Sequence, residues 1–528
     1  MKQVQMRVDE EGALRNGRFA FTNRYTLVTE LLQNARRAGA TSVDIEYDEA
    51  SKVLRVIDDG KGIEDFQTLL LINKSGWDEE TRAEESPFGV GFSKCIYSAT
   101  RVVVTSRCQR IDFETHSALS QAMIDVVDAE PSVGTIVELH GVALPFAPSA
   151  IKRLVRGFPI PVQLNGQELP RPYALDAEDL DFVDTEIGKV HLGGTQTGHS
   201  SCLDVVFLQG FCVIDDGTWG RAEQVNVVHL DSRKFLARLP DRDKLIDEEE
   251  QCKLIYATMK RLWRVVLEER KRSLNATTFC SQYFGAASSW GSADVFDDIP
   301  LLPATICEEV TDYPYQSRGG RADYLTSVHD HISREAIERG QVRLFYLDDP
   351  EEENILLWML VRACGHILVN HHLLASGHWA HAYIPTFENA SVSATPGHVS
   401  SVSWFLGSWV SGEVVMCDAY TITVDGKVVE IADEATVHEG RFLVPTGEHS
   451  GRSCLQMSDC MDEYEDIHME DIDALADFIC RLRAVDPEQT VKGLIRNLNL
   501  EKYPVLRGKT FRLSVGTDQK DLVLELVA

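Results

Sequence analysis

The chain has 528 residues, of which 44% are hydrophobic and 25% are charged. This length exceeds one ordinary core and predicts about three folded domains. The formal net charge of -30 disfavours a surface that holds phosphate backbones through clustered Lys and Arg, so nucleic acid is not an expected partner.

The cysteines and the N-terminus favour a cytoplasmic protein. Twelve cysteines are scattered without a CxxC pair, which is typical of reduced and mostly buried thiols. The opening sequence MKQVQMRVDEEGALRNG lacks the apolar core of a signal peptide. The apolar run at residues 355–361 is too short to span a bilayer, so no membrane partner is expected.

The first segment predicts an α/β sandwich over residues 1–146, with helices on one face of a mixed sheet. A helix is expected over residues 23–40, because leucines recur at helical spacing and Gly39 can form a left-handed C-cap. The strands VDIEY and VLRVI follow, and a helix is expected from Glu64 onward. GVGFSKCIYSAT predicts another helix, while RVVVTS and GTIVELHG predict strands.

The remaining chain predicts two further parts, which makes the fold class α+β. Residues 147–275 indicate a second α+β domain with an Asn-Gly hairpin and a long closing helix near residues 247–274. Residues 276–528 indicate a mixed α/β region, rich in strands between residues 403 and 444. Its role cannot be predicted from its residues.

Glu30 and Asn34 form the first candidate site. They are four residues apart in ELLQNARRAGAT, so they share one helix face. A carboxylate there can deprotonate a water, and an amide oxygen can hold a magnesium ion against phosphates. Taken alone, the same spacing also fits a solvated helix face.

IDDGKGI is the second candidate site, where an apolar strand ends in two aspartates and the glycines Gly60 and Gly62. A carboxylate fixed at a strand end, here Asp58, can accept a hydrogen bond from an exocyclic amine. Glycines let backbone approach a flat base closely. An ordinary strand-to-helix turn is the alternative, since Asp-Gly favours turns.

Two weaker elements complete the pattern. In SPFGVGFSKC, Gly89 and Gly91 precede a helix whose free N–H groups can bind an anion. Thr135 begins the strand TIVELH after Gly134, and its hydroxyl could reach a base directly or through water.

In this order and spacing, the four elements resemble the GHKL ATPases of the Bergerat fold: Hsp90-type chaperones, MutL-type repair proteins, type II topoisomerase ATPase subunits and histidine kinases. The chain looks most similar to Hsp90 and the sacsin-like branch, in which ELLQNA, a DDGxGI box, a KSG segment and FGVGF occur together. The resemblance covers about a quarter of the chain. It implies ATP and Mg²⁺ as cofactors.

The resemblance also implies roles for single residues. Glu30 looks like the water-activating base and Asn34 like the magnesium ligand. Asp58 is similar to the adenine-reading carboxylate, with Gly62 against the base and Thr135 in the same network. The phosphate-facing loop would comprise Gly89, Val90, Gly91 and Phe92, and residues 73–87 would form a mobile lid.

Hydrolysis in this family usually needs a basic side chain from the following domain. ARLPDRDKL offers Arg238, Arg242 and Lys244, and we select Arg242. A charged surface loop is the alternative. Arg36 and Arg37 stand where family members often have an acidic residue, which bears on the rate of hydrolysis more than on binding.

Five histidines between His366 and His381 lie near Cys364. Their spacing is less regular than that of zinc ligands, so packed or hydrogen-bonded histidines are expected.

The leading hypothesis is a slow Mg-dependent ATPase, similar to Hsp90 or sacsin, that couples nucleotide state to conformational change, with a second copy of the chain and a protein client as its expected partners. The alternative is an ATP-binding sensor or scaffold with little hydrolysis, in a multi-protein defence or mobile-element system. A DNA-repair type ATPase is disfavoured by the acid excess, and a histidine kinase by the lack of a phosphoacceptor helix.

Overall fold

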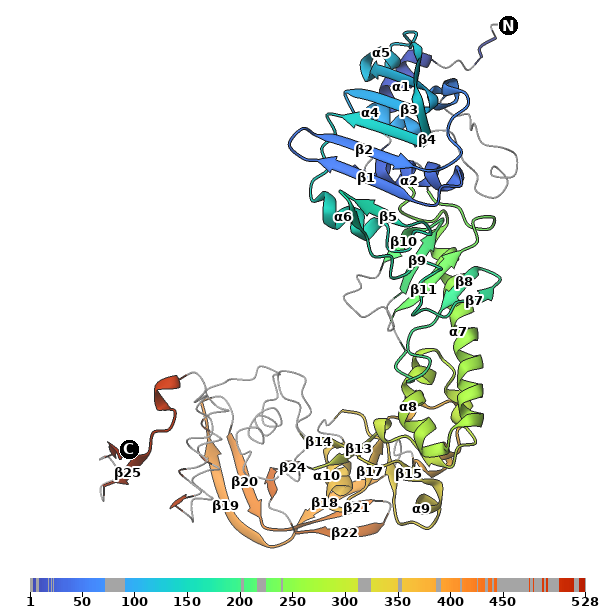
Figure 1. The fold of residues 1–528 in the computed structure, drawn as a ribbon. Coiled ribbons are helices and arrows are strands. Elements are labelled where there is room, and N and C mark those ends of the chain that lie inside the picture. Colours follow the sequence, from blue (N-terminus) through green and yellow to red (C-terminus); the bar gives the residue numbers. More distant parts are fainter. Residues whose placement is uncertain are drawn as a thin grey trace. The chain divides into compact units, whose positions relative to one another are not determined.

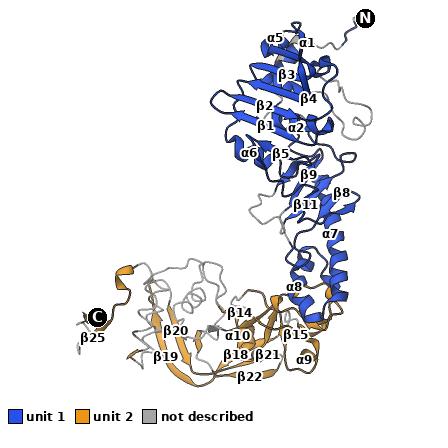
Figure 2. Cartoon of the chain, in the orientation of Figure 1, with its two compact units in different colours: residues 1–295 blue, residues 296–528 orange. Residues whose placement is uncertain are grey.

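The fold is described from a computed structural model. It covers residues 3–5, 9–17, 19, 21, 23–71, 91–200, 204–215, 225–238, 241–311, 324–349, 354–385, 391–408, 411–424, 426–432, 435–438, 441–443, 474, 478, 487–488, 491, 503–516 and 522–527. Two compact units divide the chain, residues 1–295 and 296–528 (Figure 2). The three-part division at residues 146 and 275 stays a prediction.

The first unit begins with a six-stranded sheet in the order β3-β4-β2-β1-β5-β6 (Figure 1). β1 and β5 run parallel, and the other neighbouring strands are antiparallel. The strands are β1 (Val43–Asp48), β2 (Val53–Asp58), β3 (Arg101–Glu114), β4 (Val126–His140), β5 (Val162–Leu164) and β6 (Gln167–Glu168). The helices are α1 (Glu10–Gly17), α2 (Thr26–Arg37), α4 (Gly91–Ser98), α5 (Thr115–Leu119) and α6 (Ala147–Leu154), with a 3-10 turn η2 (Phe66–Leu70).

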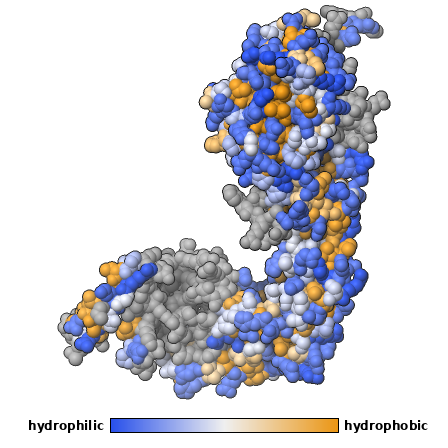
Figure 3. Space-filling view, viewed as in Figure 1, coloured by the Kyte–Doolittle hydropathy of each residue, from blue (hydrophilic) through white to orange (hydrophobic). Residues whose placement is uncertain are grey.

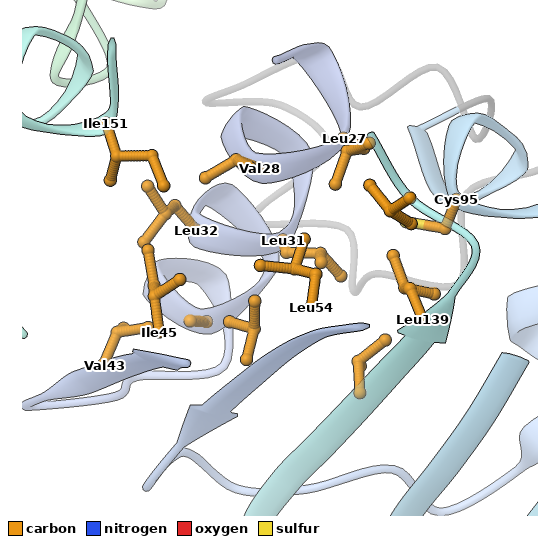
Figure 4. Packing of buried hydrophobic residues seen from close by; sticks show 14 of the residues in the cluster. Leu27, Val28, Leu31, Leu32, Val43, Ile45, Leu54, Cys95, Leu139 and Ile151 are labelled. Carbon is orange, nitrogen blue, oxygen red and sulfur yellow. The ribbon is translucent and has the colours of Figure 1, made fainter. Parts of the chain in front are cut away.

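Helices cover one face of this sheet, which confirms the predicted α/β sandwich. Leu31 and Leu32 of α2 lie over Leu54 and Ile45 of the strands, and Cys95 of α4 belongs to the same core (Figure 4). All five are at most 5% exposed. Because side chains alternate along a strand, the neighbours Ile57 and Ile136 lie on the opposite face, where they are only half-buried. Figure 3 shows hydrophobic residues over this sheet.

The Asn-Gly hairpin forms as predicted, but it extends the first sheet. Asn165 and Gly166 both have positive φ, at 50° and 77°, which is the backbone that a tight two-residue hairpin needs. The hairpin joins β5 to β6, and β5 pairs with β1. The first sheet therefore takes two strands from beyond residue 146.

A second sheet follows in the order β10-β9-β11-β8-β7, in which β9 and β11 are parallel. Its strands are β7 (Val183–Thr185), β8 (Gly188–His191), β9 (Asp204–Leu208), β10 (Phe211–Asp215) and β11 (Asn226–Leu230). The helices α7 (Glu248–Ser273) and α8 (Ala276–Ser289) pack together. α7 has three glutamates in its first turn and three basic residues in its last, which suits the helix dipole.

The second unit contains small sheets and a buried helix. Its strands are β12 (Leu301–Leu302), β13 (Cys307–Val310), β14 (Leu325–Ser327), β15 (Ile332–Ser333), β16 (Leu344–Phe345), β17 (Ile367–Val369), β18 (Val392–Pro396), β19 (Val399–Leu406), β20 (Ser411–Cys417), β21 (Tyr420–Val424), β22 (Lys427–Ile431), β23 (Ala435–His438), β24 (Arg441–Leu443), β25 (Phe511–Val515) and β26 (Leu522–Leu526). The helices are α9 (Arg334–Glu338) and α10 (Ile355–Ala363). Among the described residues, no helix is both long and apolar enough to cross a membrane.

Candidate active site

Helix α2 carries the first predicted site residues inside the core. Nine of its twelve residues are buried, and Glu30 among them is only 3% exposed. A buried carboxylate is costly unless it is paired. Arg242 supplies the partner, since its Nε donates to Glu30 Oε1 at 3.0 Å. Both side chains are less than 10% exposed, so this ion pair is shielded from solvent.

The second oxygen of Glu30 lies against the start of α4. A Cβ placed on Gly91 would lie 2.0 Å from Glu30 Oε2. A side chain at position 91 would therefore force the Glu30 carboxylate to move, and with it the contact to Arg242. Gly91 is also the first residue of α4, whose N–H groups can attract an anion. The carboxylate and the start of α4 therefore share one place in the fold.

Arg242, the basic residue selected from the sequence, reaches α2 from the chain between β11 and α7. Its NH1 group also lies 3.4 Å from Gln209 Oε1, and Gln33 Nε2 donates to the same oxygen. The other two candidates point elsewhere: Arg238 pairs with Asp243 and Lys244 with Glu248. The side chains of Arg238 and Lys244 are 62% and 52% exposed.

The backbone at this contact is strained. Gln209 and Arg242 have φ values of 56° and 55°, and Arg107 near Gly62 has 57°. Non-glycine residues rarely adopt this left-handed region, which five further described residues also adopt: Lys52, Gln121, Phe146, Asn165 and Asp247. Gln209 lies in the turn between β9 and β10.

Asp58 ends β2 within a row of polar groups across three strands. The register places Asp58 opposite Thr135, and Thr135 opposite Ser106. Ser106 Oγ donates to the Gly134 carbonyl at 2.7 Å and accepts from the Ile63 amide at 2.9 Å. Asp58 Oδ1 accepts from the Gly60 amide at 2.9 Å. Burial raises the pKa of Asp58, although this hydrogen bond acts in the opposite direction.

The neighbouring Asp59 binds Thr41 and so holds the chain after α2 in place. Its Oδ1 accepts from the Thr41 amide at 2.7 Å, and its Oδ2 accepts from the Thr41 hydroxyl. These bonds, with the Thr41 side-chain contact strongest, lower the pKa of Asp59 to about 2. Of the two aspartates, Asp59 is the one whose carboxylate binds Thr41.

Two glycines with positive φ allow the chain to pass close to Asp58 and Ser106. A Cβ on Gly134 would lie 1.8 Å from the Asp58 carbonyl oxygen. A Cβ on Gly62 would lie 2.9 Å from Ser106 Oγ. Gly62 is thus packed against Ser106 and Arg107, beside the predicted base site.

The remaining predicted residues have mixed placements. Asn34 is half-buried one turn after Glu30 on α2, where its amide oxygen could serve a metal ion that phosphates also bind. Phe92 is 8% exposed and belongs to the hydrophobic core, so only its backbone could face a phosphate. Gly89, Val90 and the lid at residues 73–87 fall outside the described residues.

The histidine cluster is packed and hydrogen-bonded, as expected. His372 Nε2 lies 3.0 Å from the Tyr346 hydroxyl, and His381 Nε2 lies 2.9 Å from the Ala375 carbonyl. His378 Nδ1 accepts from the Ala380 amide. Within the described part of the chain, no group of three His, Cys, Asp or Glu residues could hold a metal ion.

Sequence reasoning missed Ser106, Gln209 and Asp241, which contact the site. Ser106 is a fully buried polar residue in an apolar strand, and that contrast was a usable signal. Gln209 and Asp241 lie in turns far along the chain, and their sequence carries no such signal.

Comparison with known proteins assigns this region. Residues 23–136 match the family of histidine kinase-, DNA gyrase B- and HSP90-like ATPases. The DNA mismatch repair protein MutL of Shewanella amazonensis is 31% identical over 123 residues, which is 22% of this chain and 19% of that protein. MutL of Shewanella baltica is 28% identical over 174 residues, which is 31% of this chain and 27% of that protein.

Residues 23–136 therefore form a GHKL ATPase domain, a type of domain that supports ATP binding. The matched stretch spans only 19% to 27% of the length of these relatives. The relatives are mismatch repair proteins, so the finer likeness to Hsp90 and sacsin stays a prediction.

Proposed function

We propose that the chain is a slow, Mg-dependent ATPase that couples nucleotide state to the placement of residues 147–295. The contact between Arg242 and Glu30 carries this proposal. Glu30 belongs to the ATPase domain, whereas Arg242 comes from beyond it. A basic group in this position can neutralise charge as the terminal phosphate leaves.

The proposed reaction assigns each side chain one task. Glu30 accepts a proton from a water, whose oxygen forms a bond to the terminal phosphorus. The bond between that phosphorus and the oxygen of ADP breaks, so ADP and phosphate are the products. Asp58 accepts a hydrogen bond from the adenine amine, supported by Thr135. Asn34 would hold Mg²⁺, which screens the negative charge of the phosphates.

The proposed coupling between nucleotide state and the second sheet depends on Arg242. Its guanidinium can pair with Glu30 or with a terminal phosphate, but not fully with both. When its guanidinium pairs with Glu30, it neutralises the carboxylate that must take a proton. When it turns to a terminal phosphate, Glu30 is released for the water. Since Arg242 is anchored outside the ATPase domain, this exchange links nucleotide state to the position of the second sheet.

ATP turnover by the Glu30→Gln variant tests this function. Glutamine keeps an oxygen that can accept from Arg242 but removes the base, so we expect Mg-dependent turnover to fall about 100-fold. ATP binding should persist in calorimetry. Glu49→Ala removes an exposed carboxylate in the same domain and serves as the matched control. Equal turnover in Glu30→Gln and the unmodified protein would refute the assignment. Tight binding without turnover in the unmodified protein would instead support the sensor hypothesis.

A second candidate is an ATP-gated protein that acts on DNA. The identity to MutL over as many as 174 residues favours it, while the net charge of -30 opposes it. Binding of duplex DNA that weakens steeply with salt would support this candidate. Its absence at low salt, with and without ATP, would reject it.

A further inference from the structure

The chain that carries Arg242 folds back on itself before it meets α2. Ala237 and Leu245 form a β-bridge, and the Arg238 amide donates to the Lys244 carbonyl at 2.7 Å. The Arg242 amide donates to the Arg238 carbonyl at 2.9 Å. These bonds fix the backbone on both sides of residues 241 and 242. The two side chains therefore reach α2 from a braced position.

Asp241 contacts the N-terminus of α2. Its Oδ1 accepts from the Thr26 hydroxyl at 2.6 Å, and its Oδ2 accepts from the Asn23 amide at 3.2 Å. Thr26 is the first residue of α2 and is 1% exposed. Tyr25, at the N-cap, makes no side-chain capping bond. Asp241 thus places a carboxylate at a helix N-terminus that lacks its own cap, where negative charge is stabilised.

The spacing on the two sides of this contact matches. Thr26 and Glu30 are four residues apart, which places them on one face of α2, one turn from each other. Asp241 and Arg242 are adjacent, and they bind Thr26 and Glu30 respectively. Asp241 binds at the N-terminus of the helix, and Arg242 binds one turn later. A shift of one turn would place Arg242 beside Thr26 or Asn34, neither of which carries a negative charge.

The charge of the same carboxylate also acts on Lys94 of helix α4. Lys94 is 8% exposed; burial lowers its pKa, and the negative charge of Asp241 acts in the opposite direction. Asp241 therefore interacts with α2 and with α4, the two helices that meet at Glu30.

We propose that Asp241 is a positioning residue that holds the chain at Arg242 against α2, so that the guanidinium can pass from Glu30 to the terminal phosphate. This role rests on the proposed ATPase function. Asp241 itself touches neither the nucleotide nor the water. Its removal should leave ATP binding intact, because Asp58 and Thr135 read the base elsewhere in the domain. It should slow the chemical step, because Arg242 then has only its own contacts to orient it.

The test is a double-mutant cycle on the full chain, with steady-state ATP turnover measured in the presence of Mg²⁺. We expect Asp241→Ala to lower kcat about tenfold, the size expected for one charge-assisted hydrogen bond, with KM unchanged. In an Arg242→Ala background the same substitution should have no further effect on kcat, because the residue acts through Arg242. Asp243→Ala is the control, since Asp243 lies in the same loop and contacts only the exposed Arg238 among the described residues.

Thr26→Val removes the same hydrogen bond from the other side with little change in shape, and should reproduce the fall in kcat. It also keeps the test decisive if Asp241→Ala fails to fold. Equal effects of Asp241→Ala in both backgrounds, or a change in KM alone, would overturn the positioning role. If the unmodified protein hydrolyses ATP and both variants match it, only this inference fails. If the unmodified protein turns over no faster than Glu30→Gln, the proposed function fails with it.

Discussion

The ATPase domain and the second unit use their buried residues differently. In the domain, one core joins α2, α4 and α6 to the sheet, and Glu30 lies within it. In the second unit, α10 is apolar on all sides and packs into two separate clusters, one with Ile422 and one with Phe345. The 12-residue α2 thus carries a buried ion pair with Arg242 in its core, whereas the 9-residue α10 contributes apolar side chains to both of its clusters. Motifs can be recognised in the first because polar residues interrupt a core at fixed places.

The largest effects on stability should come from substitutions that leave a cavity in the core of either region. Leu54 and Ile422 are both fully buried strand residues, and replacing either with alanine should cost about 2 to 5 kcal/mol of unfolding free energy. We expect Leu54→Ala to lower the protection of amides in residues 1–295, and Ile422→Ala to lower it in residues 296–528. Hydrogen exchange measured peptide by peptide separates the two. Equal loss in both units from either variant would break the comparison.

A smaller effect is expected from a substitution of Asp58, the carboxylate that we propose binds adenine. Asp58→Asn should weaken ATP binding about 10- to 100-fold, because the amide cannot accept as strongly and presents donors to the adenine amine. Calorimetry with MgATP measures the change. Thr41 holds Asp59 in place, so Asp59→Asn should reduce thermal stability more than ATP affinity. An unchanged affinity in Asp58→Asn would contradict the role given to this carboxylate.

The pH dependence of ATP affinity gives a second test of the role of Asp58. Burial raises the pKa of Asp58, and the ionised carboxylate is the form that accepts from adenine. ATP affinity should therefore be complete above this raised pKa and should fall as the pH drops through it. In Asp58→Asn this dependence should disappear.

The smallest effect should arise at the ion pairs of Asp215, the last residue of β10, with Arg153 of α6 and with Arg156 just after that helix. Burial alone would raise the pKa of Asp215, but the guanidinium groups of Arg153 and Arg156 outweigh it and lower that pKa to about 2. Because the folded pKa is depressed, the pair stabilises the fold above the ordinary pKa, and this contribution is lost as the pH falls toward 2. Arg156→Ala should cost about 1 to 2 kcal/mol at neutral pH in urea unfolding.

Arg153→Ala provides the comparison, since Arg153 is 67% exposed and Arg156 only 16%. Its effect should be smaller because solvent screens the exposed pair. A larger cost for Arg153→Ala than for Arg156→Ala would reverse this assignment.

The sequence predicted the elements better than the contacts between them. The leucine spacing placed a helix over residues 23–40, and α2 occupies Thr26–Arg37. The helix expected from Glu64 is only the 3-10 turn η2, since Asp65 caps too short a run. Pairing of β5 with β1 was not predicted, because a parallel partner more than 110 residues away leaves no local pattern.

For the candidate site, too, the sequence identified single residues better than the contacts between them. Glu30 and Asp58 could be chosen because their motifs are local, and Arg242 because basic residues cluster before a long helix. Asp241 could not be chosen, since its partner Thr26 lies 215 positions earlier. Nor could Asp58 be separated from Asp59 by residue type. The two aspartates differ in their contacts, since the amide and the hydroxyl of Thr41 bind the carboxylate of Asp59.

The left-handed backbone at Arg107 and Arg242 has a consequence for protein engineering. Glycine adopts this region without steric cost, so both positions would attract a designer of thermostable variants. At Arg107, whose exposed side chain pairs with Glu64, glycine should raise the melting temperature. At Arg242 it would leave the buried carboxylate of Glu30 without its partner, so selection for heat resistance and selection for catalysis should both retain this codon.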